Sequence, residues 1–167
     1  MSQTRHLILG ALATAMLVAL AALFSAWPRH RTLAEGFGVV KLSFSHGGDR
    51  SASCRPLSQD ELAGLAPNMR RKEICARARP PVVVELEVDG EMLLRAVLPP
   101  SGIAGDGPSR IYKRFVLPAG EHDVAVRLRD TPRAEGFDYS AARRITLAPA
   151  QNLVIDFRPV AGGFVFN

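Results

Sequence analysis

Residues 82–98 have the sequence VVVELEVDGEMLLRAVL, and this stretch decides the fold. Apolar residues stand at every second position from Val82 to Val88, and Glu85 and Glu87 lie between the last three, which is the period of two typical of a strand with one buried face. Asp89-Gly90 follows, a dipeptide favoured in the two-residue turns of β-hairpins. Apolar residues then resume and continue to Leu98. We therefore predict a β-hairpin here.

Further strands are predicted on both sides of this hairpin. Apolar residues alternate with polar ones, or run together, in five other short segments, and residues 164–166 would add an edge strand. The five segments are residues 40–44, 111–117, 124–128, 145–147 and 153–157. Seven or eight strands at this spacing predict an all-β domain, an antiparallel β-sandwich of Ig-like type.

One short helix is expected between the first strand and the hairpin. Ser58 is a favourable N-cap, and Glu61 stands three residues later, where it completes a capping box. Gly64 and Pro67 limit this helix to about two turns.

The N-terminal part of the chain is a membrane segment by composition. Residues 7–27 form an uncharged run of 21 residues, which as a helix spans roughly 30 Å, the thickness of the hydrocarbon core. Trp27 suits the membrane interface, and Pro28 ends the helix. The predicted organisation is a tail (1–6), a transmembrane anchor (7–27), a linker (28–36) and a β-sandwich domain (37–167).

A cleaved signal peptide is the alternative to an anchor. Signal peptides carry a shorter apolar region and a small residue three positions before the cut. Cleavage after Ser25 or Ala26 would place Leu23 or Phe24 at that position. We therefore expect an uncleaved signal-anchor.

The net charge of +5 is concentrated in ten residues. Residues 70–79 hold five basic side chains and one acidic, whereas residues 80–167 hold ten basic and eleven acidic. The sequence therefore predicts one interaction patch, which docks on an acidic protein surface or an anionic bilayer, with a solvated loop as the alternative. Nucleic acid is a poor fit because no aromatic residue lies between the basic ones. The patch consists of Arg70, Arg71, Lys72, Arg77 and Arg79.

The chain has two cysteines, Cys54 and Cys75, which flank the short helix. In an oxidising compartment they would form a disulfide, and two free thiols in a reducing compartment are the alternative. The disulfide would pin the helix and present the basic stretch from a fixed loop. Replacing either cysteine by serine should then destabilise the domain by a few kcal/mol. A redox function is not indicated, because Cys-x-x-Cys is absent.

No catalytic motif or cofactor site is predicted. The glycines between residues 102 and 107 are followed by Pro108 and a strand, whereas a phosphate loop leads into a helix. A copper or zinc site assembled from the cysteines, His46 and His122 is the alternative function, although their spacings match no zinc pattern. We expect a binding protein and not an enzyme.

Residues 82–158 resemble the PEGA-type domain, a small extracytoplasmic β-sandwich often tethered to bacterial membranes. The resemblance rests on Val88-Asp89-Gly90-Glu91, on Leu117-Pro118-Ala119-Gly120-Glu121-His122, on Gly136-Phe137 and on Leu147-Ala148-Pro149. It implies a binding or spacing role and no catalysis. The loop at 99–109 is longer than the family's pattern, and segment 47–80 has no counterpart there.

The expected orientation follows from the resemblance and the cysteines. Arg5 is the only Lys or Arg before the apolar run, whereas Arg29 and Arg31 follow it closely, so the positive-inside rule would keep the domain in the cytoplasm. We nevertheless expect a single-pass protein of the bacterial cytoplasmic membrane with its domain in the periplasm. There it would act as an accessory protein that docks on a larger membrane complex or envelope component.

Overall fold

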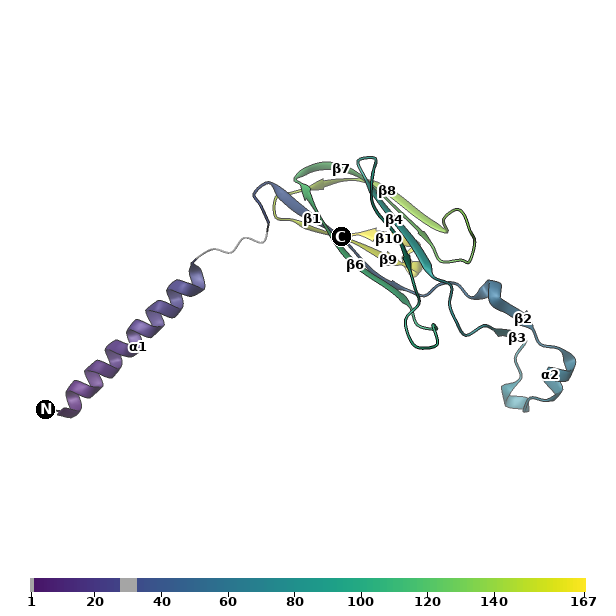
Figure 1. Ribbon diagram of the computed structural model, residues 1–167, viewed down its shortest axis with the longest axis horizontal. Coiled ribbons are helices and arrows are strands. Elements are labelled where there is room, and N and C mark those ends of the chain that lie inside the picture. The colour runs from purple at the N-terminus through teal and green to yellow at the C-terminus, as the bar shows by residue number, and fades with distance from the viewer. Residues whose placement is uncertain (1, 28–32) are drawn as a thin grey trace. The chain divides into compact units, whose positions relative to one another are not determined.

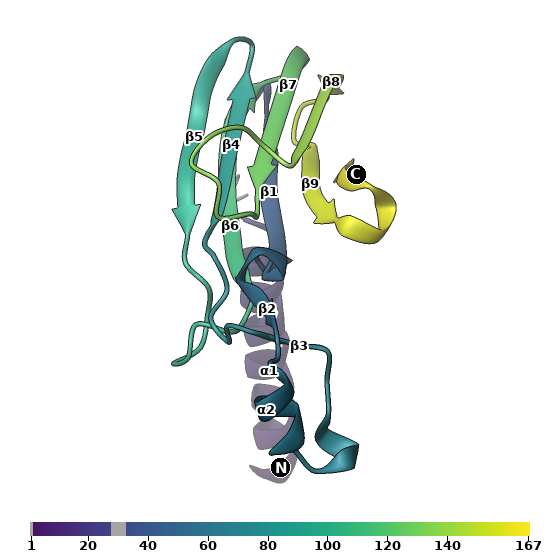
Figure 2. The same ribbon diagram turned by 90° about the vertical axis from the view of Figure 1, so that its right-hand side faces the viewer.

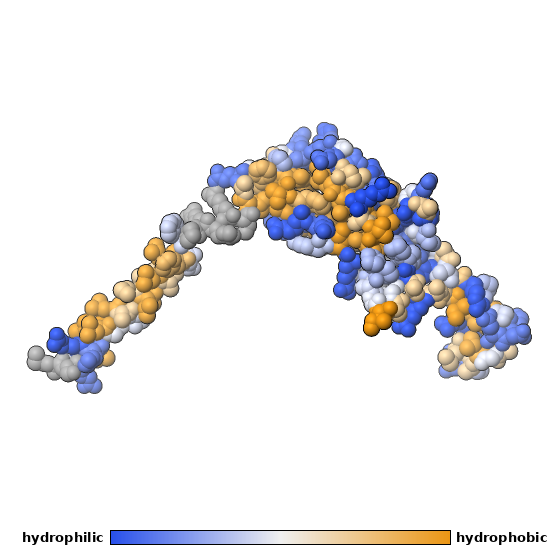
Figure 3. Space-filling model, viewed as in Figure 1, coloured by the Kyte–Doolittle hydropathy of each residue, from blue (hydrophilic) through white to orange (hydrophobic). Residues whose placement is uncertain are grey.

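The computed structural model describes residues 2–27 and 33–167, and it divides into two compact units, residues 1–34 and 35–167. The first contains α1 (Ser2–Ala26), which begins before the apolar run. The helix is long and apolar enough to cross a membrane, and apolar side chains cover most of its visible surface (Figure 3). Residues 28–32 of the predicted linker lie outside the described residues.

The second unit is mostly β-structure (Figure 1). Its described residues form ten strands and a short helix, α2 (Gln59–Ala63). The strands are β1 (Phe37–His46), β2 (Cys54–Pro56), β3 (Glu73–Cys75), β4 (Val82–Val88), β5 (Glu91–Leu98), β6 (Ser109–Pro118), β7 (Gly120–Arg129), β8 (Tyr139–Leu147), β9 (Asn152–Arg158) and β10 (Gly163–Phe166).

Eight of these strands form two four-stranded sheets, in the orders β10-β9-β1-β6 and β5-β4-β7-β8. The chain passes from one sheet to the other after β1, after β5, after β6 and after β8 (most of these strands are labelled in Figure 2). After the last of these crossings, β9 lies beside β1 in the same direction and pairs with it in parallel. The prediction of purely antiparallel pairing is therefore wrong for this pair.

One hydrophobic core joins the two sheets. Leu42 of β1, Leu86 of β4 and Leu128 of β7 are fully buried in it, as the alternating pattern of these strands predicts. Burial of such side chains contributes roughly 1.5–3 kcal/mol each to the free energy of folding. All buried members of the core come from the second unit, so this unit supplies its own core.

The predicted hairpin is confirmed as β4 and β5. Val88 and Glu91 are paired across the turn, and both turn residues have positive φ, 54° at Asp89 and 82° at Gly90. This is the geometry of a type I′ turn, which Asp-Gly adopts at low cost. The Asp89 carboxylate also accepts a hydrogen bond from the backbone N–H of Asp123, which ties the turn to β7.

Candidate functional site: a disulfide-closed basic arm

Residues 47–80 form an excursion from the sheets, hereafter the arm. It leaves the end of β1 and returns to the start of β4, and it extends beyond the two four-stranded sheets (Figure 1). Its two ends meet, because a Cβ added at Gly48 would lie 2.2 Å from the carbonyl oxygen of Pro80. The arm is therefore a closed projection attached at one place.

A short hairpin of β2 and β3 forms the stem of the arm, and a disulfide closes it. Cys54 and Cys75 are register partners in this hairpin, and their sulfur atoms are bonded at 2.01 Å. The predicted cysteine pairing is thus present. Backbone hydrogen bonds extend the ladder on both sides, from Ala76 N–H to Ser53 and from Leu57 N–H to Lys72.

The capping box predicted for the short helix is confirmed. The backbone N–H of Glu61 donates to Ser58 Oγ, and the backbone N–H of Ser58 donates to Glu61 Oε2. Arg55 of the stem donates two further hydrogen bonds to the Glu61 carboxylate, and these lower its pKa to about 2. Because Gly64 is the C-cap, α2 has five residues and is shorter than predicted.

The arm has no core of its own. No residue from 49 to 81 is buried, and the apolar side chains Leu62, Leu65 and Ile74 are only partly buried. Its order therefore depends on the disulfide, the short β-ladder and the capping box. Segments held by exposed hydrogen bonds and few apolar contacts open at low free energy.

Two of the five predicted patch residues hold the base of the arm to the loop before β6. Arg77 Nε lies 2.6 Å from Asp106 Oδ2, and Arg77 lowers the pKa of this carboxyl group. Arg79 donates to two carbonyl oxygens, that of Asp106 at 2.9 Å and that of Gly48 at 3.0 Å. These two arginines therefore position the arm.

The other three patch residues make no contact of this kind with the loop before β6. Arg70, Arg71 and Lys72 are all exposed. Arg70 donates one long hydrogen bond to the Leu65 carbonyl at 3.4 Å, and Arg71 and Lys72 have no side-chain partner among the described residues. Met69, immediately before them, is 61% exposed. The free part of the patch is thus a run of three cations beside an exposed apolar side chain.

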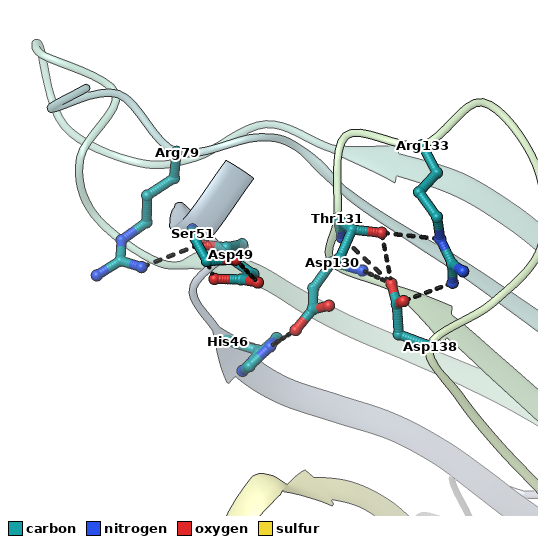
Figure 4. Close-up of polar contacts among 9 residues, drawn as sticks. His46, Asp49, Ser51, Arg79, Asp130, Thr131, Arg133 and Asp138 are labelled. Atoms are coloured by element: carbon teal, nitrogen blue, oxygen red, sulfur yellow. Dashed lines mark hydrogen bonds and ion pairs between the residues drawn. The ribbon is translucent and has the colours of Figure 1, made fainter. Parts of the chain in front are cut away.

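A polar cluster lies where the arm leaves the sheets (Figure 4). His46 Nε2 is 2.7 Å from Asp130 Oδ2, and the backbone N–H of Asp49 donates to the Asp130 carbonyl. The His46 ring packs edge-on against Phe157, with centroids 4.7 Å apart. The cluster therefore joins the end of β1 to the end of β7 and supports the base of the arm.

Asp138 organises the neighbouring loop between β7 and β8 (Figure 4). It accepts hydrogen bonds from the backbone N–H groups of Asp130 and Thr131, and from the Thr131 hydroxyl group. Arg133 pairs with its other oxygen at 2.5 Å. Both oxygens of the Asp138 carboxylate are therefore used to hold this loop.

His122 is buried at the other end of β7. Its Nε2 lies 2.9 Å from the Pro118 carbonyl, which can only accept, so this nitrogen carries a proton. Its Nδ1 lies 2.6 Å from Asp89 Oδ2, and this carboxylate stabilises a proton on Nδ1, which raises the pKa of His122. Both ring nitrogens are engaged, so this histidine has no lone pair for a metal.

The structure does not bring the suggested metal ligands together. Among the described residues, Cys54, Glu73 and Cys75 are the one group of three with ligand atoms within 4.8 Å of one another. Its two cysteines are joined in the disulfide, and neither His46 nor His122 belongs to the group.

The His122–Asp89 pair predicts a pH dependence of stability. Because folding raises the pKa of His122 above 6.5, its contribution is fully present below pH 6.5 and is lost as the pH rises through the folded-state value. We expect the urea midpoint to fall between pH 6 and 9 more in the native sequence than in Asp89→Asn, which keeps a favourable Asn-Gly turn. Equal pH profiles for both proteins would contradict this assignment.

No protein-family model matches the sequence, and no curated protein matches it. The geometry alone therefore defines the class: a β-rich protein with one N-terminal helix able to anchor in a membrane, and with a disulfide-closed basic arm.

Proposed function

We propose that this protein is a non-enzymatic accessory protein of the bacterial cytoplasmic membrane. In this proposal, α1 is an uncleaved single-pass anchor, and the second unit is a periplasmic β-sandwich of the PEGA type. The arm is the docking element, and its partner is an acidic surface on a larger membrane complex or envelope component.

The observation that carries the proposal is the segregation of the arm from the core. An excursion of this length with no buried residue from 49 to 80 contributes little to the stability of the sheets. It nevertheless contains a cross-link, a capped helix and a clamped base, which together fix the backbone that carries Arg70, Arg71 and Lys72. An exposed display of unpaired cations on a cross-linked backbone suits recognition of an acidic surface.

The arm lies at the end of the domain remote from the point where the chain enters it. The chain enters the domain at Phe37, and the arm begins beyond His46, at the other end of β1. At about 3.3 Å per residue, ten residues of strand separate these two points by roughly 30 Å. The disulfide supports the periplasmic placement, because such bonds persist in oxidising compartments.

A photo-crosslinking amino acid at Lys72 tests the proposal in the full-length protein in its native membrane. We expect a cross-link to a protein partner that is lost in the Arg70→Glu/Arg71→Glu variant and weakened at high salt, because exposed charges are screened. The matched control places the cross-linker at Val160, which is fully exposed and outside the arm. Cross-links to lipid alone, or equal cross-linking from Val160, would contradict the proposal.

A further inference from the structure

The strand β6 has a free edge. It is the last strand in the order β10-β9-β1-β6, so β1 pairs with one side of it and no strand of the described residues lies beside its other side. The pairing with β1 runs over the full ten residues, from Ser109 to Pro118. Such an edge offers backbone N–H and C=O groups to an additional strand.

Unpaired cations are concentrated on this edge strand. Arg110, Lys113 and Arg114 are exposed, and they make no ion pair or side-chain hydrogen bond with the described residues. Three cations on the outer face of the opposite sheet differ, because each of them has an acidic partner in a neighbouring strand. These pairs are Arg95–Glu85, Arg127–Glu87 and Arg144–Asp123.

A like-charge pair adds to this imbalance. Lys41 of β1 and Arg114 of β6 are register partners, so their side chains lie side by side on the outer face of the sheet. Like charges directly opposite each other in an antiparallel pair are unfavourable. An anionic group bound near Arg114 would relieve this repulsion.

Apolar groups accompany the charges at the spacing of a strand. On the outer face, Arg110 and Arg114 alternate with Tyr112 and Val116, which are 61% and 55% exposed. A shallow hollow of about 610 Å³ lies beside them and is lined partly by Ser43, Arg110 and Tyr112. Asp156 also lines it, but its carboxylate is paired with Arg158. This face thus presents cationic and apolar positions in alternation.

We propose that β6 binds an extended acidic segment of a partner protein, which adds to the sheet as a fifth strand. Its backbone pairs with the free edge of β6. Its acidic side chains, four residues apart, lie opposite Arg110 and Arg114, with an apolar residue between them opposite Tyr112. Strand addition of this kind takes its affinity from the backbone and its specificity from alternate side chains.

A second copy of the chain does not fit the same edge. Pairing of two β6 strands would bring Arg110, Lys113 and Arg114 against the same cations, which is unfavourable. Lys113 shares the core-facing side with Leu42, and an inward charge on an edge strand opposes self-association. The charges therefore select against self-pairing and in favour of an acidic strand.

The test uses the full-length protein in zwitterionic nanodiscs and a synthetic peptide, TETVTETVTE. We expect the peptide to bind and to slow amide hydrogen exchange in β6. Arg114→Glu should weaken binding at least tenfold without lowering the melting temperature, because a carboxylate then faces Lys41. Arg143→Glu on β8 makes the same charge change on an exposed residue of the other sheet and should alter binding less than twofold.

Two controls separate strand addition from other modes of binding. A peptide N-methylated at alternate residues keeps its charge but loses the backbone donors of one edge, and it should not bind. Equal binding of this peptide, or an Arg114-dependent attachment to anionic vesicles without peptide binding, would overturn the proposal. The Arg70→Glu/Arg71→Glu variant should bind the peptide normally, because the arm takes no part in this binding. Peptide binding to β6 would therefore stand even if the arm proved not to be a docking element.

Discussion

Serine at Cys54 or Cys75 is expected to release the arm while the two four-stranded sheets remain folded. Closing a loop of about 20 residues stabilises it by roughly 3 kcal/mol in the chain-entropy model. Since each 1.4 kcal/mol is a factor of ten, trypsin should cleave after Arg70, Arg71 and Lys72 about 100 times faster. The double variant should behave like either single one, because all three remove the same bond.

The structure confines this effect to the arm. The sequence predicts that loss of the disulfide destabilises the whole domain, but no residue from 49 to 81 is buried. The free energy of global unfolding should therefore change by much less than 3 kcal/mol. Ala76→Ser, an exposed substitution beside Cys75, is the matched control and should leave the cleavage rate unchanged. If the free energy of global unfolding fell by the same roughly 3 kcal/mol that the faster cleavage implies, the arm would be part of the cooperative core.

The features that sequence could predict are local in the chain. The β4–β5 hairpin follows from alternation and from Asp89-Gly90, and the capping box follows from Ser58 and Glu61 three residues apart. The parallel pairing of β1 with β9 depends on strands more than 100 residues apart, and alternation alone says which residues form a strand but not which strand lies beside it.

The interaction patch shows the same distinction. In sequence, Arg70, Arg71, Lys72, Arg77 and Arg79 form one basic stretch. In the structure, Arg77 and Arg79 contact Asp106. This residue lies far from them along the chain, so a count of charges over residues 70–79 does not include it. The near-zero net charge of residues 80–167 similarly conceals the unpaired positive charge of β6. The acidic residues that balance it in the sum lie on the other sheet, where they are already paired with arginines.

Membrane orientation has the largest consequence for function, and two arguments about it disagree. Arg29 and Arg31 lie after the apolar run, which favours a cytoplasmic domain. The disulfide between Cys54 and Cys75 favours an oxidising compartment. We expect the domain to be outside the cytoplasm, and we expect Arg29→Gln/Arg31→Gln to leave this orientation unchanged.

A reporter fused after Asn167 tests the account most directly. With a phosphatase that is active only outside the cytoplasm, we predict high activity in the membrane fraction, on a chain of full uncleaved length. A matched fusion to a reporter active only in the cytoplasm should be silent. The reverse pattern would place the domain in the cytoplasm and contradict the proposed function, while activity on a shortened, soluble chain would show that α1 is a cleaved signal sequence.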